Sequence, residues 1–118
     1  MDKYCIRLGY TIKEAIERID ASKNRAVIVL NDDYKVVGVI SQGDIIRALS
    51  AGKSLYARID PMIRLDFLYM NKRDMEKAYV LFKKTKITLL PIIDDDFHLV
   101  NAINMDDIYE YLEAKCNI

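Results

Sequence analysis

The chain carries the same sequence pattern twice. Residues 11–49 align with residues 74–112 without a gap, and identical residues recur at matching positions. Among these pairs are Ala15 and Ala78, Lys23 and Lys86, Val37 and Val100, Ile40 and Ile103, Asp44 and Asp107, and Leu49 and Leu112. A repeat of about 63 residues indicates a duplicated supersecondary unit, and two copies favour a pseudo-twofold pair over a solenoid.

The first copy predicts a helix, two strands and a second helix. Thr11 and Glu14 have the spacing of a capping box, and apolar residues follow at helical intervals. A short continuous apolar run is typical of a buried strand. Ser41 opens a second helix, which ends at Gly52, a residue suited to a C-terminal cap. The predicted elements are a helix over 11–23, strands over 26–30 and 35–40, and a helix over 41–52.

The second copy predicts the same order, with Asp74 as the cap of its first helix. The predicted elements are a helix from 74, strands over 88–93 and 99–103, and a helix over 105–114, with a lead-in strand over 64–70 that matches one over 4–8. One copy alone cannot cover both faces of its sheet, so we expect an α/β (α+β) fold with sheet packed against sheet. The predicted division is 1–52 for the first repeat, 53–63 for a connector and 64–118 for the second repeat.

Composition excludes several classes of function. The formal net charge is zero and the pI is about 6.6, which gives no electrostatic footprint for nucleic acid or an anionic membrane. The sequence has no apolar run of about 18 residues, the length that a transmembrane helix needs. We therefore expect a cytoplasmic protein in which Cys5 and Cys116 are reduced thiols.

The segment around residues 37–44 resembles a known family motif. It reads Val-Gly-Val-Ile-Ser-Gln-Gly-Asp, an apolar strand containing glycine followed by Ser-x-x-Asp at the start of a helix. This is similar to the CBS motif, named for a domain of cystathionine β-synthase, and the pair resembles a Bateman module. The second copy departs from the motif, because Asn101 replaces the glycine and Asn104 replaces the hydroxyl residue. Pro91 in the preceding strand is also typical of the family.

The resemblance implies a regulatory module that senses a nucleotide between its repeats, with AMP, ADP, ATP or another nucleotide as ligand and no cofactor or metal. It assigns Ser41 to phosphate and Asp44 to ribose, because a hydroxyl and a helix N-terminus stabilise an anion and a carboxylate accepts two hydroxyls. Arg47, one turn later on the same face, adds a cation for phosphate. Asn104 and Asp107 are the candidates for a second, weaker site.

One alternative to ligand binding remains open. Ser-x-x-Asp is itself a capping arrangement, so the module could be a dimerisation scaffold that binds nothing. The sequence contains no nucleophile–base pair and no glycine-rich phosphate loop. We therefore interpret the chain as non-catalytic. A finer similarity, from Ser41 to Met62, points to CBS pairs fused to sugar-phosphate nucleotidyltransferases, and the family implies a homodimer. The run from Asp94 to Asp96, His98, and the group Lys83, Lys84 and Lys86 are interpreted as solvated surface.

Overall fold

The computed structural model describes residues 2–116. In chain order its elements are the 3-10 turn η1 (Asp2–Tyr4), β1 (Cys5–Arg7), α1 (Ile12–Ser22), β2 (Ala26–Leu30), β3 (Val36–Ser41), α2 (Gln42–Ser50), the 3-10 turn η2 (Asp60–Met62), α3 (Met75–Thr85), β4 (Leu89–Ile93), β5 (Leu99–Asn104) and α4 (Met105–Cys116). Both copies of the predicted helix–strand–strand–helix unit are confirmed, with boundaries that differ by one or two residues. No helix in this part of the chain is both long and apolar enough to cross a bilayer.

The first helix of each repeat begins and ends in the same way. The Thr11 side chain caps α1 as half of a capping box with Glu14, and the Asp74 side chain accepts a hydrogen bond from the backbone N–H of Lys77 at the start of α3. Lys23 and Lys86 close the two helices in the left-handed conformation, with φ of 59° and 63°. The predicted caps are therefore confirmed at both helix starts.

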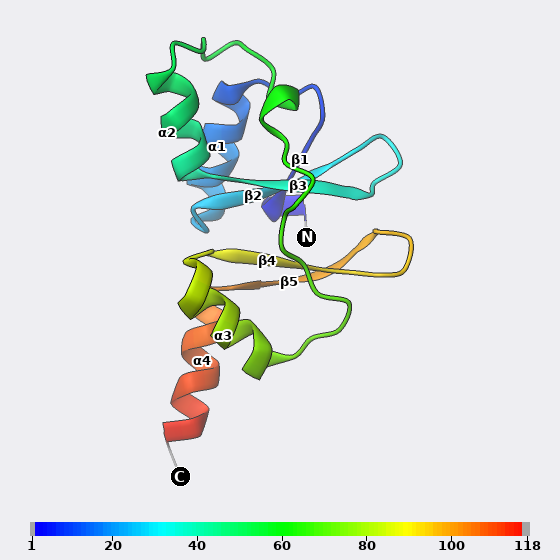
Figure 1. Ribbon diagram of the computed structural model, residues 1–118, viewed down its shortest axis with the longest axis vertical. Helices are drawn as coiled ribbons and strands as arrows, with labels where there is room; N and C mark the ends of the chain where they lie inside the picture. The colour runs from blue at the N-terminus through cyan, green and yellow to red at the C-terminus, as the bar shows by residue number, and fades with distance from the viewer. Residues whose placement is uncertain (1, 117–118) are drawn as a thin grey trace.

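Two small sheets stack against each other, and the helices cover their outer faces (Figure 1). The first sheet has the order β1-β2-β3, with β1 parallel and β3 antiparallel to β2, and the second pairs β4 with β5 antiparallel. Helices α1 and α2 lie on the face of the first sheet that points away from the second sheet, and α3 and α4 lie on the opposite, outer face of the second sheet. The core between the sheets consists of Cys5, Ala26, Ile28, Val36, Leu89, Ile93 and Ala102. This confirms the predicted packing of sheet on sheet.

The predicted lead-in strand over 64–70 is wrong for the second repeat. Only Met70 pairs with β4, through a single parallel bridge in which its N–H donates to the Pro91 carbonyl and its carbonyl accepts from Ile93. The next bond of a parallel ladder, two residues earlier, needs an N–H donor at Pro91, and proline has none. The segment before Met70 therefore stays irregular, whereas β1 forms a regular strand in the first repeat.

The tips of the two hairpins meet at the pseudo-twofold axis. Lys35 forms an antiparallel bridge with His98. His98 occupies the position in the second repeat that corresponds to Lys35 in the first. The backbone N–H of Val36 also donates to the Phe97 carbonyl at 2.8 Å. The repeats are thus joined by backbone hydrogen bonds as well as by the apolar core.

The connector crosses the first repeat and completes its core. Ile59 is fully buried, and Arg58 forms a bridge with Thr11 at the start of α1. Ile63 lies over Gly38 in β3, where an added Cβ would be only 3.1 Å from Ile63 Cγ2. The family glycine at position 38 therefore has a packing reason in this chain, since a side chain there would push against the connector.

Candidate functional site

A cavity of about 520 Å³ lies between the repeats, at the N-terminus of α2. The first repeat contributes the beginning of β2, the end of β3 and the first two turns of α2. The second contributes residues 85–89, where α3 leads into β4, and the lead-in contributes Arg64 and residues 66–68. This volume falls within the range of small-molecule sites in proteins. The predicted residues Ser41, Asp44 and Arg47 all line it.

Ser41 and Asp44 form a reciprocal capping box at the mouth of α2. The Asp44 N–H donates to Ser41 Oγ at 3.2 Å, and Asp44 Oδ2 accepts from the Ser41 backbone N–H at 2.9 Å and from its hydroxyl at 3.1 Å. The capping box of Thr11 and Glu14 has the same three distances. This arrangement therefore accounts for Ser41 and Asp44 as helix-capping residues without a ligand.

Arg47 folds back over the first turn of α2 and pairs with Asp44. Its Nη2 atom lies 2.6 Å from Asp44 Oδ1. Gly43 makes room for this conformation, because a Cβ there would lie 3.3 Å from Arg47 Nη1. The Arg47 side chain is 69% exposed, so it can leave the carboxylate when another hydrogen-bond donor arrives. A carboxylate offers about four acceptor positions and Ser41 uses two of them, so Asp44 can accept two hydroxyls once Arg47 has left.

The charge of Asp44 is held by these contacts. Its partial burial raises the pKa, but hydrogen bonds from Ser41 and Arg47 outweigh that effect and leave the pKa below its ordinary value of 3.8. Asp44 is therefore ionised at neutral pH and remains a pure hydrogen-bond acceptor.

The rest of the cavity combines apolar walls with positive charge. Val39, Phe67 and Ile87 supply apolar surface of the kind that a flat ring can pack against. Arg25, Arg64 and Lys86 also line it, so the cavity has four cations when Arg47 is included.

The equivalent position in the second repeat is built differently. Asn104 and Asp107 do form a capping box, with Asp107 Oδ2 accepting from the Asn104 N–H at 3.0 Å and Asn104 Oδ1 accepting from the Asp107 N–H at 2.9 Å. However, the Asn104 amide also donates to the Tyr4 hydroxyl at 3.4 Å, and Asp107 pairs with Arg73 at 3.7 Å.

A second cavity of about 290 Å³ lies nearby. Its walls come from the turn between α1 and β2 and from the first turns of α4, including Asp106 and Tyr109, and neither Asn104 nor Asp107 lines it. The structure thus brings three of the predicted site residues to a cavity and leaves the other two engaged with protein groups.

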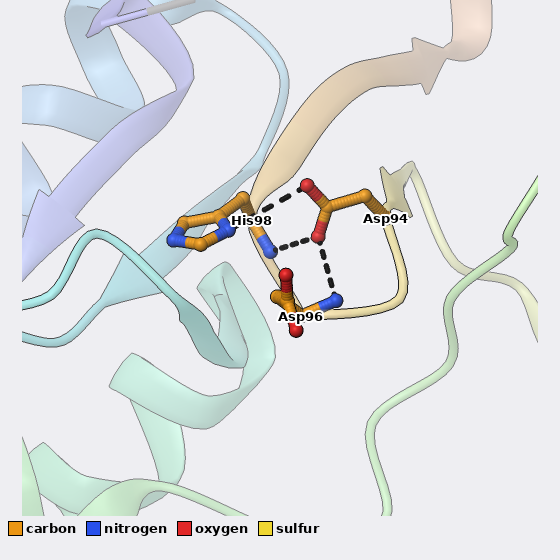
Figure 2. Close-up of side chains that lie close together, drawn as sticks. All are labelled: Asp94, Asp96 and His98. Atoms are coloured by element: carbon orange, nitrogen blue, oxygen red, sulfur yellow. Dashed lines mark hydrogen bonds and ion pairs between the residues drawn. The ribbon is translucent and has the colours of Figure 1, made fainter.

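The acidic hairpin of the second repeat brings Asp94, Asp96 and His98 together (Figure 2). One ligand-type atom of each lies within 4.8 Å of the others. Asp94 Oδ1 accepts from the backbone N–H groups of Asp96 and His98, both at 2.9 Å, and the N–H of His98 lowers the pKa of Asp94 below 3.8. In the first repeat the uncharged Asn31 accepts the same two bonds, from Asp33 and Lys35, at 2.9 and 3.0 Å. The geometry is therefore that of a turn which forms equally well without the charge.

Sequence reasoning missed several residues of the larger cavity. Arg25 precedes β2, Arg64 follows the connector and Lys86 ends α3, and none of them belongs to the Ser-x-x-Asp motif. Lys86, interpreted as solvated surface, is exposed but also lines the cavity. The signal that could have pointed to it is its place just before the strand that faces the motif across the pseudo-twofold axis.

Comparison with known proteins supports the family resemblance. Residues 1–51 match the family model of the CBS domain. The chain is 27% identical over 107 residues to the arabinose 5-phosphate isomerase GutQ of Escherichia coli O6:H1, covering 89% of this chain and 33% of that protein. The chain thus spans about a third of the length of this relative.

Solved structures share the whole fold. A putative acetoin utilization protein, AcuB, from Vibrio cholerae has a TM-score of 0.81 and 19% identity, covering 96% of this chain and 84% of that one. The CBS domain protein PAE2072 from Pyrobaculum aerophilum, complexed with AMP, has a TM-score of 0.75 and 17% identity, covering 93% and 90%. The CBS domain pair of MJ0100, in complex with 5′-methylthioadenosine and S-adenosyl-L-methionine, has a TM-score of 0.76 and 19% identity. The match covers 94% of this chain and 88% of that one. We conclude that the first repeat matches the CBS domain and that the chain as a whole has the fold of a CBS domain pair.

Proposed function

We propose that this chain is a regulatory module that binds a nucleotide in the larger cavity between its repeats. The observation that carries the proposal is the cavity itself, because an ionised carboxylate, a helix N-terminus, apolar walls and cations converge there from both repeats. Asp44 accepts hydrogen bonds from the ribose hydroxyls, while Ser41 and Arg47 contact the phosphate. The AMP and adenosyl ligands of the structural relatives favour an adenosyl nucleotide.

Binding would regulate a partner by changing how the repeats pack. Ligand contacts made by α2 and by residues 85–89 would tie the first repeat to the second. A ligand shifts such an equilibrium only as far as it prefers one arrangement to the other. The GutQ relative suggests a sugar-phosphate isomerase as the attached or partner enzyme, in place of the nucleotidyltransferase that the sequence suggested. We propose that the module itself is not catalytic and acts in the cytoplasm.

One nucleotide per chain follows from the difference between the two motif positions. Asn104 donates to Tyr4 and Asp107 pairs with Arg73, so a ligand in the second repeat would have to displace both contacts. At the larger cavity the exposed Arg47 must move away from Asp44, and the Ser41 hydroxyl must turn from Asp44 toward the phosphate.

The test is a calorimetric titration of the chain with AMP, ADP and ATP, repeated on Asp44→Ala and on Glu14→Ala. The two variants remove the acidic residue from capping boxes of equal geometry, but Glu14 is outside the cavity. We expect Asp44→Ala to weaken binding by at least about tenfold, since a hydrogen bond to a charged group contributes about 1.5–3 kcal/mol. Glu14→Ala should retain the wild-type affinity. Equal affinities in the wild type and Asp44→Ala would contradict the site assignment.

A scaffold without a ligand is the second candidate. It is favoured by one observation: within residues 2–116, every buried side-chain polar atom already has a hydrogen-bond partner in the protein. Exposed apolar residues on three helices, Ile46 and Leu49 on α2, Val80 on α3 and Tyr109 on α4, are the proposed surface of a homodimer. A folded protein that sediments as a tight dimer and gives no heat with any nucleotide would support this candidate.

A further inference from the structure

The larger cavity carries an excess of positive charge that the motif does not explain. Arg47 is paired with Asp44, which leaves Arg25, Arg64 and Lys86 facing one further carboxylate, Asp66. Within residues 2–116, none of these three cations forms an ion pair or a side-chain hydrogen bond. Like charges gathered around a cavity raise the local concentration of an anionic ligand.

The three cations reach the cavity from three separate segments. Arg25 ends the turn between α1 and β2, Arg64 follows the connector, and Lys86 caps the C-terminus of α3. Only the packing of the two repeats brings them around one space. The positive charge is therefore a property of the assembled pair of repeats, whereas Ser41 and Asp44 belong to one helix start.

Arg25 and Lys86 both have a left-handed backbone, but only that of Arg25 lacks a left-handed counterpart in the other repeat. Its φ is 59°, in the left-handed region that residues other than glycine seldom adopt. The other positive-φ residues outside glycine fall into equivalent pairs, Lys23 with Lys86 and Tyr34 with Phe97. The counterpart of Arg25 is Thr88, which is absent from this group.

The strained backbone of Arg25 is tied to the start of α2. Its carbonyl accepts a hydrogen bond from the Gln42 N–H at 2.9 Å, next to Ser41. The Arg25 side chain therefore starts beside the helix N-terminus that would hold a phosphate. Residues other than glycine in the left-handed region are often associated with function.

We propose that this cavity selects its nucleotide by phosphate charge, through Arg25, Arg64 and Lys86. The inference rests on the proposed nucleotide site and defines its ligand class. AMP, ADP and ATP, with two or more negative charges, fit the excess of cations. Adenosine offers no charge, and S-adenosylmethionine brings a sulfonium cation that these side chains repel. The site accordingly favours nucleoside phosphates over other adenosyl ligands.

The experiment is a calorimetric titration with adenosine, S-adenosylmethionine, AMP, ADP and ATP at low and high salt. We expect AMP to bind at least about tenfold more tightly than adenosine or S-adenosylmethionine, because charge-assisted hydrogen bonds to phosphate are the strong ones. High salt should weaken the binding of AMP more than the binding of adenosine. Adenosine binding as tight as that of AMP would overturn the inference while leaving the proposed site intact.

Matched variants locate the effect. Arg25→Gln and Lys86→Gln should each weaken the binding of AMP by about tenfold and leave the affinity for adenosine unchanged. Lys23→Gln is the control, because Lys23 is the counterpart of Lys86, caps α1 in the same left-handed conformation and is outside the larger cavity. Loss of AMP binding in Lys23→Gln to the same degree, or none in the other two, would contradict the inference. A wild-type protein that binds none of the five ligands would refute the proposed function itself, and the inference with it.

Discussion

The two motif positions of this chain have the same local geometry and different surroundings. Ser41 with Asp44, and Asn104 with Asp107, form reciprocal capping boxes whose hydrogen bonds from the N–H of Ser41 or Asn104 to the carboxylate measure 2.9 and 3.0 Å. A capping box is therefore common to both repeats, with or without a hydroxyl. The motif therefore fixes the start of a helix, and neighbouring segments decide whether a cavity forms beside it.

The surroundings differ at three equivalent pairs of positions. Gly38, covered by Ile63, corresponds to the exposed Asn101. Arg47, which pairs with Asp44, corresponds to Glu110, so the charge one turn along the helix is reversed. Phe67, which lines the larger cavity, corresponds to Tyr4, whose hydroxyl bonds Asn104. These exchanges separate the two positions more clearly than the motif residues do.

Exchanging the residues at the first pair should have the largest effect on stability. Gly38→Asn places a side chain where even a Cβ would be 3.1 Å from Ile63, so we expect a loss of about 2 kcal/mol, as for other overpacked core positions. The reverse exchange, Asn101→Gly, is at an exposed position and should cost about 1 kcal/mol or less. Urea unfolding of both variants measures the difference. Equal losses would show that the connector yields to the new side chain.

Removing the N-cap side chains should have a smaller and equal effect in the two repeats. Ser41→Ala and Asn104→Ala each delete one capping acceptor, which is worth about 1 kcal/mol of stability. Thermal unfolding should shift by similar amounts in both. If Ser41 also contacts phosphate, only Ser41→Ala should weaken AMP binding in the same samples. A much larger loss of stability at one position would mean that the two boxes are not equivalent.

The Arg47 contact should appear as a pH effect of less than about 1 kcal/mol, because the arginine is mostly exposed. The folded-state pKa of Asp44 lies below 3.8, so its stabilising contribution is present above pH 3.8 and is lost as the pH falls through the lower folded value. Arg47→Gln removes one of the bonds that lower this pKa and should move the loss to higher pH. Unfolding free energies measured between pH 2.5 and 7 would reveal it, and superimposable profiles would exclude the contact.

The hairpin turns should tolerate an exchange of their residues with only a small effect. Asn31 and Asp94 accept the same pair of backbone hydrogen bonds in the two repeats. Asn31→Asp should therefore leave the unfolding midpoint nearly unchanged at neutral pH, and Asp94→Asn should lower it only slightly, because the lowered pKa of the exposed Asp94 shows that its charge is weakly favoured in the fold. A marked loss in Asp94→Asn alone would indicate that the charge next to His98 has a role beyond the turn.

The elements that sequence predicted correctly are those with a local signal. The capping side chains of Thr11, Ser41 and Asp74 indicate where helices begin, and the apolar composition of 26–30 indicates a buried strand. The lead-in before Met70 was predicted wrongly because Pro91, a residue of another strand, removes the donor it needed. Nothing within 64–70 itself carries that information.

The candidate site divides along the same line. Ser41, Asp44 and Arg47 share one helix, so their proximity follows from spacing alone. Arg25, Arg64 and Lys86 meet only after both sheets have packed, and their positions in the sequence differ by tens of residues. Without the fold, Lys86 is indistinguishable from Lys83 and Lys84, its neighbours on the last turn of α3.

The bridge between Lys35 and His98 has a consequence for the history of the chain. A residue that pairs with its own counterpart is what the axis of an isologous dimer contains. The two repeats thus have the geometry of a symmetric assembly of two copies that a connector has joined into one polypeptide. Once joined, the copies no longer need to keep identical sequences. One could retain a glycine and an arginine beside its helix start, while the other acquired asparagine and glutamate at the same places.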